Sequence, residues 1–91
     1  MSMKRERLYR VSVDELDGVT IEYFLTVDDV CRSDPYGIGI VMRKNSEQTE
    51  EYVNMEHICS DRQEMVRFIE RLAQGKVCPV SLAEIMDDYL A

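Results

Sequence analysis

The sequence predicts a segregated α+β domain of order ββββαα, in which a four-stranded antiparallel sheet of two hairpins is followed by two helices packed on it. Apolar and polar residues alternate with a period of two over residues 7–58, apart from the turns. Over residues 60–91 the apolar positions instead recur three and four residues apart. Runs of strands followed by runs of helices are typical of α+β folds rather than wound parallel ones.

The length and composition predict a single domain covering residues 1–91. Ninety-one residues leave room for one hydrophobic core. The 45% hydrophobic and 32% charged residues suit a packed globular domain and exclude a disordered chain. A domain this small has a modest stability margin, so we expect that a homodimer could supplement it.

The period-two pattern predicts four strands, over residues 7–13, 19–27, 36–42 and 50–58. In the first two strands the odd-numbered apolar residues share one face, which we assign to the core. The core face of the third strand comprises Tyr36, Ile38, Ile40 and Met42. The fourth strand has Val53 and Met55 inward and many charged residues outward, which is typical of an exposed edge.

Asp17-Gly18 predicts the turn of the first hairpin. Facing residues of paired strands lie on the same side of a sheet, so the loop must keep the two core faces together. A Leu16-Asp17-Gly18 loop with a left-handed Gly18 does this. In that register Val13 lies opposite Ile21.

Two capping boxes predict the helix starts, at Ser60 with Gln63 and at Ser81 with Glu84. The first helix ends near Gly75. Its apolar positions are Met65, Phe68, Ile69 and Leu72. The second runs close to the C-terminus, with an apolar stripe of Leu82, Ile85, Met86, Tyr89 and Leu90.

Four large apolar residues fall on the sheet face opposite the predicted core: Leu8, Phe24, Val41 and Tyr52. If both helices cover one face, these residues form an exposed patch that marks a protein partner or a homodimer interface. If one helix covers each face, they are ordinary core. The sequence leaves both arrangements open.

Gly37 and Gly39 leave one side of the third strand smooth. They lack the third glycine and the following helix of a dinucleotide-binding motif. We therefore expect another backbone or a ring to approach closely there. A small-molecule site beside these glycines is a further alternative.

Cysteine usage predicts a reducing compartment. Cys31, Cys59 and Cys78 are odd in number and widely spaced, unlike the sets that staple secreted domains. The N-terminus lacks the apolar region of an export signal, and no apolar run could span a bilayer. We expect a cytoplasmic protein.

His57 and Cys59 are the candidate catalytic pair, because i and i+2 on a strand point the same way and Cys59 precedes a helix start. The favoured interpretation is structural, since a cysteine beside a helix cap is ordinarily a small buried residue. A zinc site from these two with Cys31 and Cys78 lacks the usual close ligand pairs. We therefore expect no metal and no cofactor.

A formal net charge of −7 and a pI of about 4.6 argue against binding to nucleic acid or anionic lipid. A basic partner would suit this surface. The basic segment from Lys4 to Arg10 is interpreted as a solvated tail and strand start.

With Glu22-Tyr23-Phe24-Leu25 in the second strand and Tyr36-Gly37-Ile38-Gly39-Ile40 in the third, the chain resembles a family of short bacterial proteins classed only as a domain of unknown function. The resemblance spans most of the chain and implies a bacterial cytoplasmic protein. It carries over no catalytic or binding residue.

The resulting hypothesis is a non-enzymatic interaction or regulatory module. It would bind a protein partner, or a second copy of itself, through the apolar sheet face, an edge strand or the terminal helix. The alternative is a small thiol-dependent enzyme or redox-responsive protein that uses Cys59 with His57.

Overall fold

The computed structural model describes residues 3–13, 18–28, 33–44 and 49–90. Four strands are followed by two helices, which confirms the predicted order ββββαα. The elements are β1 (Met3–Val13), β2 (Val19–Asp28), β3 (Tyr36–Lys44), β4 (Thr49–Cys59), α1 (Arg62–Gln74), the 3-10 turn η1 (Pro79–Ser81) and α2 (Leu82–Leu90). Within these described residues, neither helix has the length and apolar character needed to cross a membrane.

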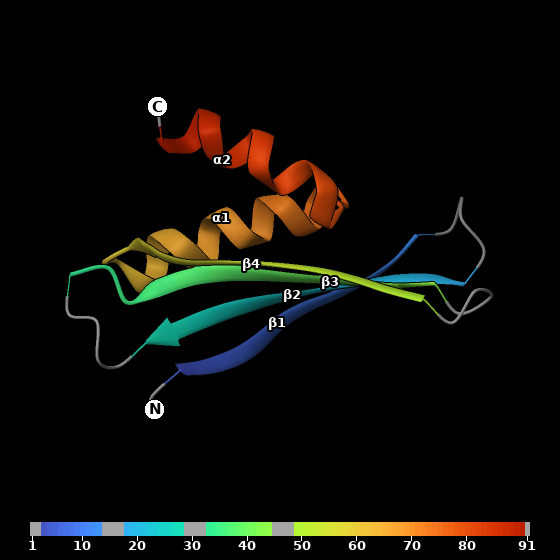
Figure 1. Ribbon diagram of the computed structural model, residues 1–91, viewed down its shortest axis with the longest axis horizontal. Coiled ribbons are helices and arrows are strands. Elements are labelled where there is room, and N and C mark those ends of the chain that lie inside the picture. The colour runs from blue at the N-terminus through green and yellow to red at the C-terminus, as the bar shows by residue number, and fades with distance from the viewer. Residues whose placement is uncertain (1–2, 14–17, 29–32, 45–48, 91) are drawn as a thin grey trace.

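The four strands form one antiparallel sheet in the order β1-β2-β3-β4 (Figure 1). Both predicted hairpins, β1–β2 and β3–β4, are present, and β2 also pairs with β3. The strands β1 and β4 are therefore the two edges of the sheet. The predicted exposure of β4 is confirmed for its described polar residues, which include Glu51, Asn54 and Glu56.

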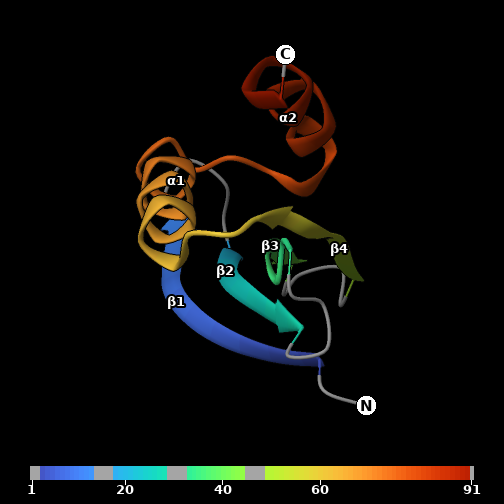
Figure 2. The same ribbon diagram turned by 90° about the vertical axis from the view of Figure 1, so that its left-hand side faces the viewer.

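Both helices lie on the same side of the sheet (Figures 1 and 2). α1 contacts all four strands, and η1 contacts β3 and β4. Of the two arrangements that the sequence leaves open, the one with a single covered face is correct. We call the side under the helices the covered face and the other side the uncovered face.

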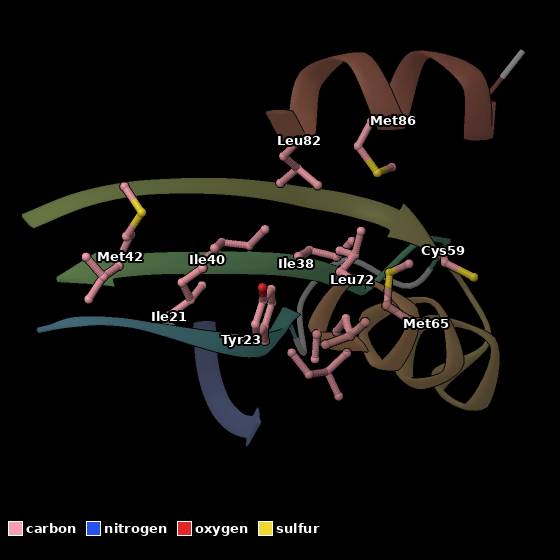
Figure 3. Packing of buried hydrophobic residues seen from close by; sticks show 14 residues of the cluster. Ile21, Tyr23, Ile38, Ile40, Met42, Cys59, Met65, Leu72, Leu82 and Met86 are labelled. Carbon is pink, nitrogen blue, oxygen red and sulfur yellow. The ribbon is translucent and has the colours of Figure 1, made fainter. Parts of the chain in front are cut away.

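The hydrophobic core fills the space between the covered face and the helices (Figure 3). Strand residues predicted to face the core are fully buried there, namely Ile21, Tyr23, Leu25, Ile38 and Ile40. The helices contribute the buried side chains Met65, Ile69, Leu72, Leu82 and Met86. Burying one such side chain stabilises the fold by about 1.5–3 kcal/mol.

The first hairpin has a different register from the predicted one. Val13 lies opposite Val19, not opposite Ile21. The predicted pairing is wrong by two residues, and the predicted loop residues Leu16 and Asp17 lie outside the described residues, as do all of residues 14–17. The predicted left-handed conformation of Gly18 is confirmed by its φ of 72°. Since the register differs by an even number of residues, the predicted core faces still match.

A β-bulge interrupts β1. Arg7 lies opposite Phe24 and Tyr9 lies opposite Tyr23, so Leu8 is an extra residue with no partner of its own. Leu8 and Tyr9 both pack against the core. The expectation that Leu8 lies on the uncovered face is therefore wrong, because the bulge turns its side chain toward the helices.

A wider irregularity lies between β3 and β4. Tyr36 pairs with Cys59 and Ile38 pairs with Met55, so residues 56–58 all oppose Gly37. The backbone approaches so closely that a Cβ at Gly37 would lie 2.3 Å from the Met55 carbonyl oxygen. This confirms the expected close backbone approach at this glycine.

α1 has a different N-cap from the predicted one. The Asp61 carboxylate accepts hydrogen bonds from the backbone N–H groups of Gln63 (2.9 Å) and Glu64 (3.4 Å). The predicted cap at Ser60 is wrong, because its neighbour, also a favoured N-cap residue, occupies the position. The predicted end is confirmed, since Gly75 is the C-cap.

α2 begins directly after Ser81, as predicted. Leu82 and Met86 point from this helix toward the sheet (Figure 3). The side chains of Tyr89 and Leu90, which belong to the same predicted stripe, lie outside the described ones. Leu82 and Met86 are therefore the described side chains through which α2 packs against the core.

Candidate functional site

Three of the four residues predicted to lie opposite the core are on the uncovered face: Phe24, Val41 and Tyr52. Phe24 is half-buried, and Val41 is only 5% exposed although it lies outside the main core cluster. Tyr52 alone is well exposed, at 69%. The uncovered face is therefore not the broad apolar patch that was one of the two arrangements left open by the sequence.

Arginines occupy much of this face instead. The bulge at Leu8 brings Arg5, Arg7 and Arg10 of β1 to the same side of the sheet. Without the extra residue, Arg10 would point away from the other two, because successive strand side chains alternate. Arg43 of β3 lies on the same face, and all four arginines are exposed.

A buried carboxylate lies at the centre of these arginines. Glu22 is 4% exposed and accepts hydrogen bonds from Arg7 (2.9 Å) and from Arg43. Arg43 also donates to Glu50 of β4 at 2.9 Å. The hydrogen bond from Arg7 holds the pKa of Glu22 below its usual value, and the charges of Arg43 and Arg10 act in the same direction, against the effect of burial.

Arg5 covers the aromatic ring at this surface. Its guanidinium carbon lies 4.3 Å from the centroid of the Phe24 ring. This is a cation–π contact, in which the ring's negative face attracts the guanidinium. Phe24 is therefore screened from solvent by a charged side chain rather than presented as an open apolar surface.

A second surface feature is a hollow at the β4 edge, which we call the edge groove. It is lined by Glu51, Tyr52 and Val53 of β4 and by Pro79 and Val80 of η1. Tyr52 (69% exposed) and Val80 (77% exposed) are the two exposed large apolar side chains among the described residues. Both therefore belong to one site, although they are distant in sequence.

The surroundings of the edge groove are acidic. β4 contains three glutamates, Glu50, Glu51 and Glu56. The described part of α2, the helix that follows η1, carries two further acidic residues, Glu84 and Asp87. None of β4, η1 or α2 contains a lysine or arginine. A positively charged ligand would be attracted to this edge of the sheet.

Another shallow hollow lies on α1, lined by Arg62, Gln63, Val66 and Arg67. Arg62 is already paired with Glu6 of β1 at 2.9 Å. The described lining residues come from one helix, and neither exposed large apolar side chain of the described residues lies there. We assign no function to this hollow.

The two residues of the candidate catalytic pair, His57 and Cys59, lie in different surroundings, one exposed and the other buried. His57 is exposed, has a φ of 58°, and its Nε2 lies 2.7 Å from a carboxylate oxygen of Asp28. Cys59 is buried in the core cluster near Met65 (Figure 3). Its sulfur accepts a hydrogen bond from the backbone N–H of Asp61 at 3.4 Å. No hydrogen bond joins His57 to Cys59 among the described residues.

The other cysteines give no further support for a reactive centre. Cys78 is a free, half-buried thiol, and Cys31 lies outside the described residues. No group of three or more metal-ligating side chains occurs within the parts of the chain that the structure describes. The set of Cys31, His57, Cys59 and Cys78 considered as zinc ligands lies partly outside the described residues, so the absence of a metal site stays a prediction.

The two glycines of β3 are closely packed. A Cβ at Gly39 would meet the Asn54 side-chain oxygen at 2.7 Å. The Thr26 hydroxyl oxygen beside Gly37 is buried and has no hydrogen-bond partner among the described residues. The β4 backbone and the Asn54 side chain thus occupy the space in which the sequence suggested a small-molecule site.

Sequence reasoning missed two features: the arginine cluster on the uncovered face, and the position of Val80 in the edge groove. The signal for the cluster was the Lys4 to Arg10 segment, which was interpreted as a solvated tail and strand start. The strand interpretation is confirmed by β1, but grouping of the arginines on one face depends on the bulge. Nothing in the sequence near Val80 indicates that η1 lies beside β4.

The family model of DUF6514, described as a family of unknown function, matches residues 3–91. No curated protein and no solved structure matches the chain. The comparisons therefore provide a family but no activity, ligand or partner that could be assigned to either surface.

Proposed function

The chain belongs to DUF6514, a family of unknown function, and we propose that it is a non-enzymatic protein-interaction module that binds a basic segment of a partner in the edge groove. The observation that carries the proposal is the position of both exposed large apolar residues, Tyr52 and Val80, in one hollow. Exposed apolar groups gathered at one site are typical of binding surfaces.

An apolar anchor of the partner would fill the hollow that Tyr52 and Val80 help to line. Tyrosine is enriched among the residues that contribute most to protein–protein affinity. β4 is also an edge strand, and its outward backbone groups could pair with an extended segment. Apolar anchoring and backbone pairing would thus act on the same segment of the partner.

The acidic surroundings define the charge of the partner. Glu51 lines the groove, and neither β4 nor η1 supplies a lysine or arginine to neutralise it. Lysines or arginines flanking the apolar anchor would therefore be attracted. Charge complementarity raises the association rate and excludes acidic competitors more than it raises affinity.

A second copy of the chain is a poorer occupant of this edge. Pairing of two β4 strands would join two edges that each carry Glu50, Glu51 and Glu56 and contain no lysine or arginine. Like charges directly opposite one another destabilise strand pairs. We therefore favour a different, basic protein over a homodimer formed through β4.

A labelled peptide of alternating lysine and leucine residues tests the proposal by fluorescence anisotropy. We expect Tyr52→Ala and Val80→Ala each to weaken binding by about tenfold, which corresponds to about 1.4 kcal/mol. Both residues are largely exposed, so the variants should remain folded. Unchanged affinity in both variants would exclude the groove as the binding site.

A matched pair of charge reversals separates local from general electrostatics. Glu51→Lys and Glu56→Lys change the net charge equally on the same strand, but only Glu51 lines the groove. We expect the first variant to weaken peptide binding several-fold more than the second. Equal losses would mean that the peptide responds only to overall charge, and the proposed site would be abandoned.

A further inference from the structure

Charge is distributed unevenly over the molecule. The chain has 18 acidic and 11 basic residues, yet the uncovered face gathers Arg5, Arg7, Arg10 and Arg43 around Glu22 and Glu50. Asp28 lies at the end of this face, beside His57. An excess of arginine on one face of an acidic protein is unexpected, and the helices leave that face open (Figure 2).

We propose that the uncovered face binds an acidic, extended segment of a protein partner through Arg5, Arg7 and Arg10. This site is separate from the edge groove and does not depend on it. The two surfaces would select ligands of opposite charge, the arginine face an acidic segment and the edge groove a basic one.

The arginines already bind carboxylates within the chain. Glu22 receives hydrogen bonds from Arg7 and Arg43, and Glu50 receives one from Arg43. The planar guanidinium fork matches the geometry of a carboxylate. Arg5 and Arg10 are exposed, and no hydrogen bond to a carboxylate occupies either of them within the described residues. They are therefore fully open to an incoming acidic segment. Arg7 donates to Glu22 through one guanidinium nitrogen and its side chain is 57% exposed, so it can contact the same segment.

The spacing of the arginines indicates the form of that segment. Arg5 and Arg7 are separated by two residues along β1, which corresponds to about 7 Å in a strand. Alternate side chains of an extended peptide have the same spacing. Acidic residues at every second position would thus match the arginines, whereas adjacent acidic residues would point to opposite sides of the peptide.

Single-stranded nucleic acid fits this face less well. Proteins that bind it without sequence preference stack successive bases on aromatic rings. Arg5 lies over the Phe24 ring at 4.3 Å, which leaves Tyr52 as the exposed aromatic residue of the described uncovered face. The net charge of −7 would also repel a dense polyphosphate more strongly than a short acidic segment.

The test uses the full chain and labelled eight-residue peptides. One peptide alternates glutamate with serine, and a second has the same composition with its glutamates in one block. We expect saturable binding of the alternating peptide, at least fivefold tighter than the block isomer, and weaker at higher salt. Equal binding of the two peptides would overturn the inference, because net charge alone would explain it. Absence of saturable binding would overturn it as well.

Neighbouring residues on opposite faces provide a matched control. Arg5→Gln and Arg10→Gln should each weaken binding of the alternating peptide at least fivefold. Lys4→Gln removes the same charge from β1, but Lys4 pairs with Val27 on the covered face and should change affinity less than twofold. An equal loss in Lys4→Gln would refute a face-specific site. Unchanged thermal unfolding would establish that each variant remains folded.

Two further measurements distinguish other occupants. Tighter binding of a single-stranded thymidine oligonucleotide than of the acidic peptide would assign the face to nucleic acid and overturn the proposal. Sedimentation that reveals self-association lost in Arg10→Gln, with no peptide binding, would assign it to a second copy. Monomeric protein that binds the acidic peptide but not the oligonucleotide is the expected result.

Discussion

The two faces of the sheet are built from the same four strands but differ in what screens them from water. On the covered face, Ile40 and Tyr23 are fully buried by the helices. On the uncovered face, Val41 is almost as buried, but Arg5, Arg7 and Arg43 extend over the strands beside it. The long apolar stems of arginines can screen a sheet while their charged ends stay in water.

This difference shows that one face can provide most of the stability while the other remains available for binding. Apolar packing between sheet and helices involves many contacts that are lost together when a large side chain is removed. Exposed charged side chains contribute less, because water screens their interactions. Substitutions on the two faces should therefore differ in how much they lower the free energy of unfolding and in how that loss depends on pH.

The largest expected effect is that of Ile40→Ala. Removing this fully buried side chain should lower the free energy of unfolding by about 3–4 kcal/mol. Tyr52→Ala, on the other face and 69% exposed, should change it by no more than about 0.5 kcal/mol. Urea unfolding of both variants measures the contrast. Comparable losses would mean that the uncovered face also belongs to the core.

Alanine at the two glycines of β3 should distinguish backbone from side-chain neighbours. At Gly37 a Cβ would lie 2.3 Å from the Met55 carbonyl oxygen and 2.8 Å from the Glu56 Cα, so the backbone must shift. We expect Gly37→Ala to cost about 2–3 kcal/mol. At Gly39 the nearest atom belongs to the Asn54 side chain, which can rotate, so Gly39→Ala should cost less than about 1 kcal/mol. A larger loss for Gly39→Ala than for Gly37→Ala in urea unfolding would contradict this packing.

Glu22→Gln should reveal the pH dependence of the uncovered face. The pKa of Glu22 is lowered in the folded state, so its contribution to stability is present above the unfolded value of about 4.3. That contribution is lost as the pH falls from there through the folded pKa. We expect a loss of about 1–2 kcal/mol at pH 7.

The difference between wild type and Glu22→Gln should therefore shrink in urea unfolding as the pH falls from 7 to 3. The control is Glu50→Gln, which removes a carboxylate that is 52% exposed and should have a smaller effect. A difference that stays constant over this pH range would show that the ion pairs of Glu22 do not contribute.

Tyr23→Phe should give the smallest of these losses, because it removes one hydrogen bond and little volume. The Tyr23 hydroxyl donates to the Val77 carbonyl oxygen at 2.9 Å and ties β2 to the segment after α1. Burial raises the pKa of Tyr23, so the hydroxyl remains a donor through the neutral range. We expect a loss of about 1 kcal/mol in thermal or urea unfolding. Unchanged stability would mean that the bond makes no net contribution.

Much of the covered face could be predicted from the sequence. The alternation through Ile21, Tyr23 and Leu25 identifies the buried side of β2, because a strand buries every second residue. The spacing of Met65, Ile69 and Leu72 likewise identifies the buried side of α1, although Phe68, predicted with them, is only half-buried. These patterns are local, so they survive the error in hairpin register.

The uncovered face could not be predicted in the same way, because its character depends on one extra residue. Leu8 suits either side of a strand, and nothing in the sequence marks it as a bulge. Without that bulge, Arg10 would not join Arg5 on this face. The side chosen by the helices and the contact of η1 with β4 are tertiary arrangements that local periodicity does not contain.

The most direct test of the division between the two faces is the unfolding transition of Phe24→Asp. Phe24 lies half-buried on the uncovered face beneath Arg5, and an aspartate there could pair with the neighbouring arginines. The expected result is a folded protein with a cooperative transition and weakened binding of the acidic peptide. Loss of cooperative unfolding would contradict the account, because it would mean that this face is part of the hydrophobic core.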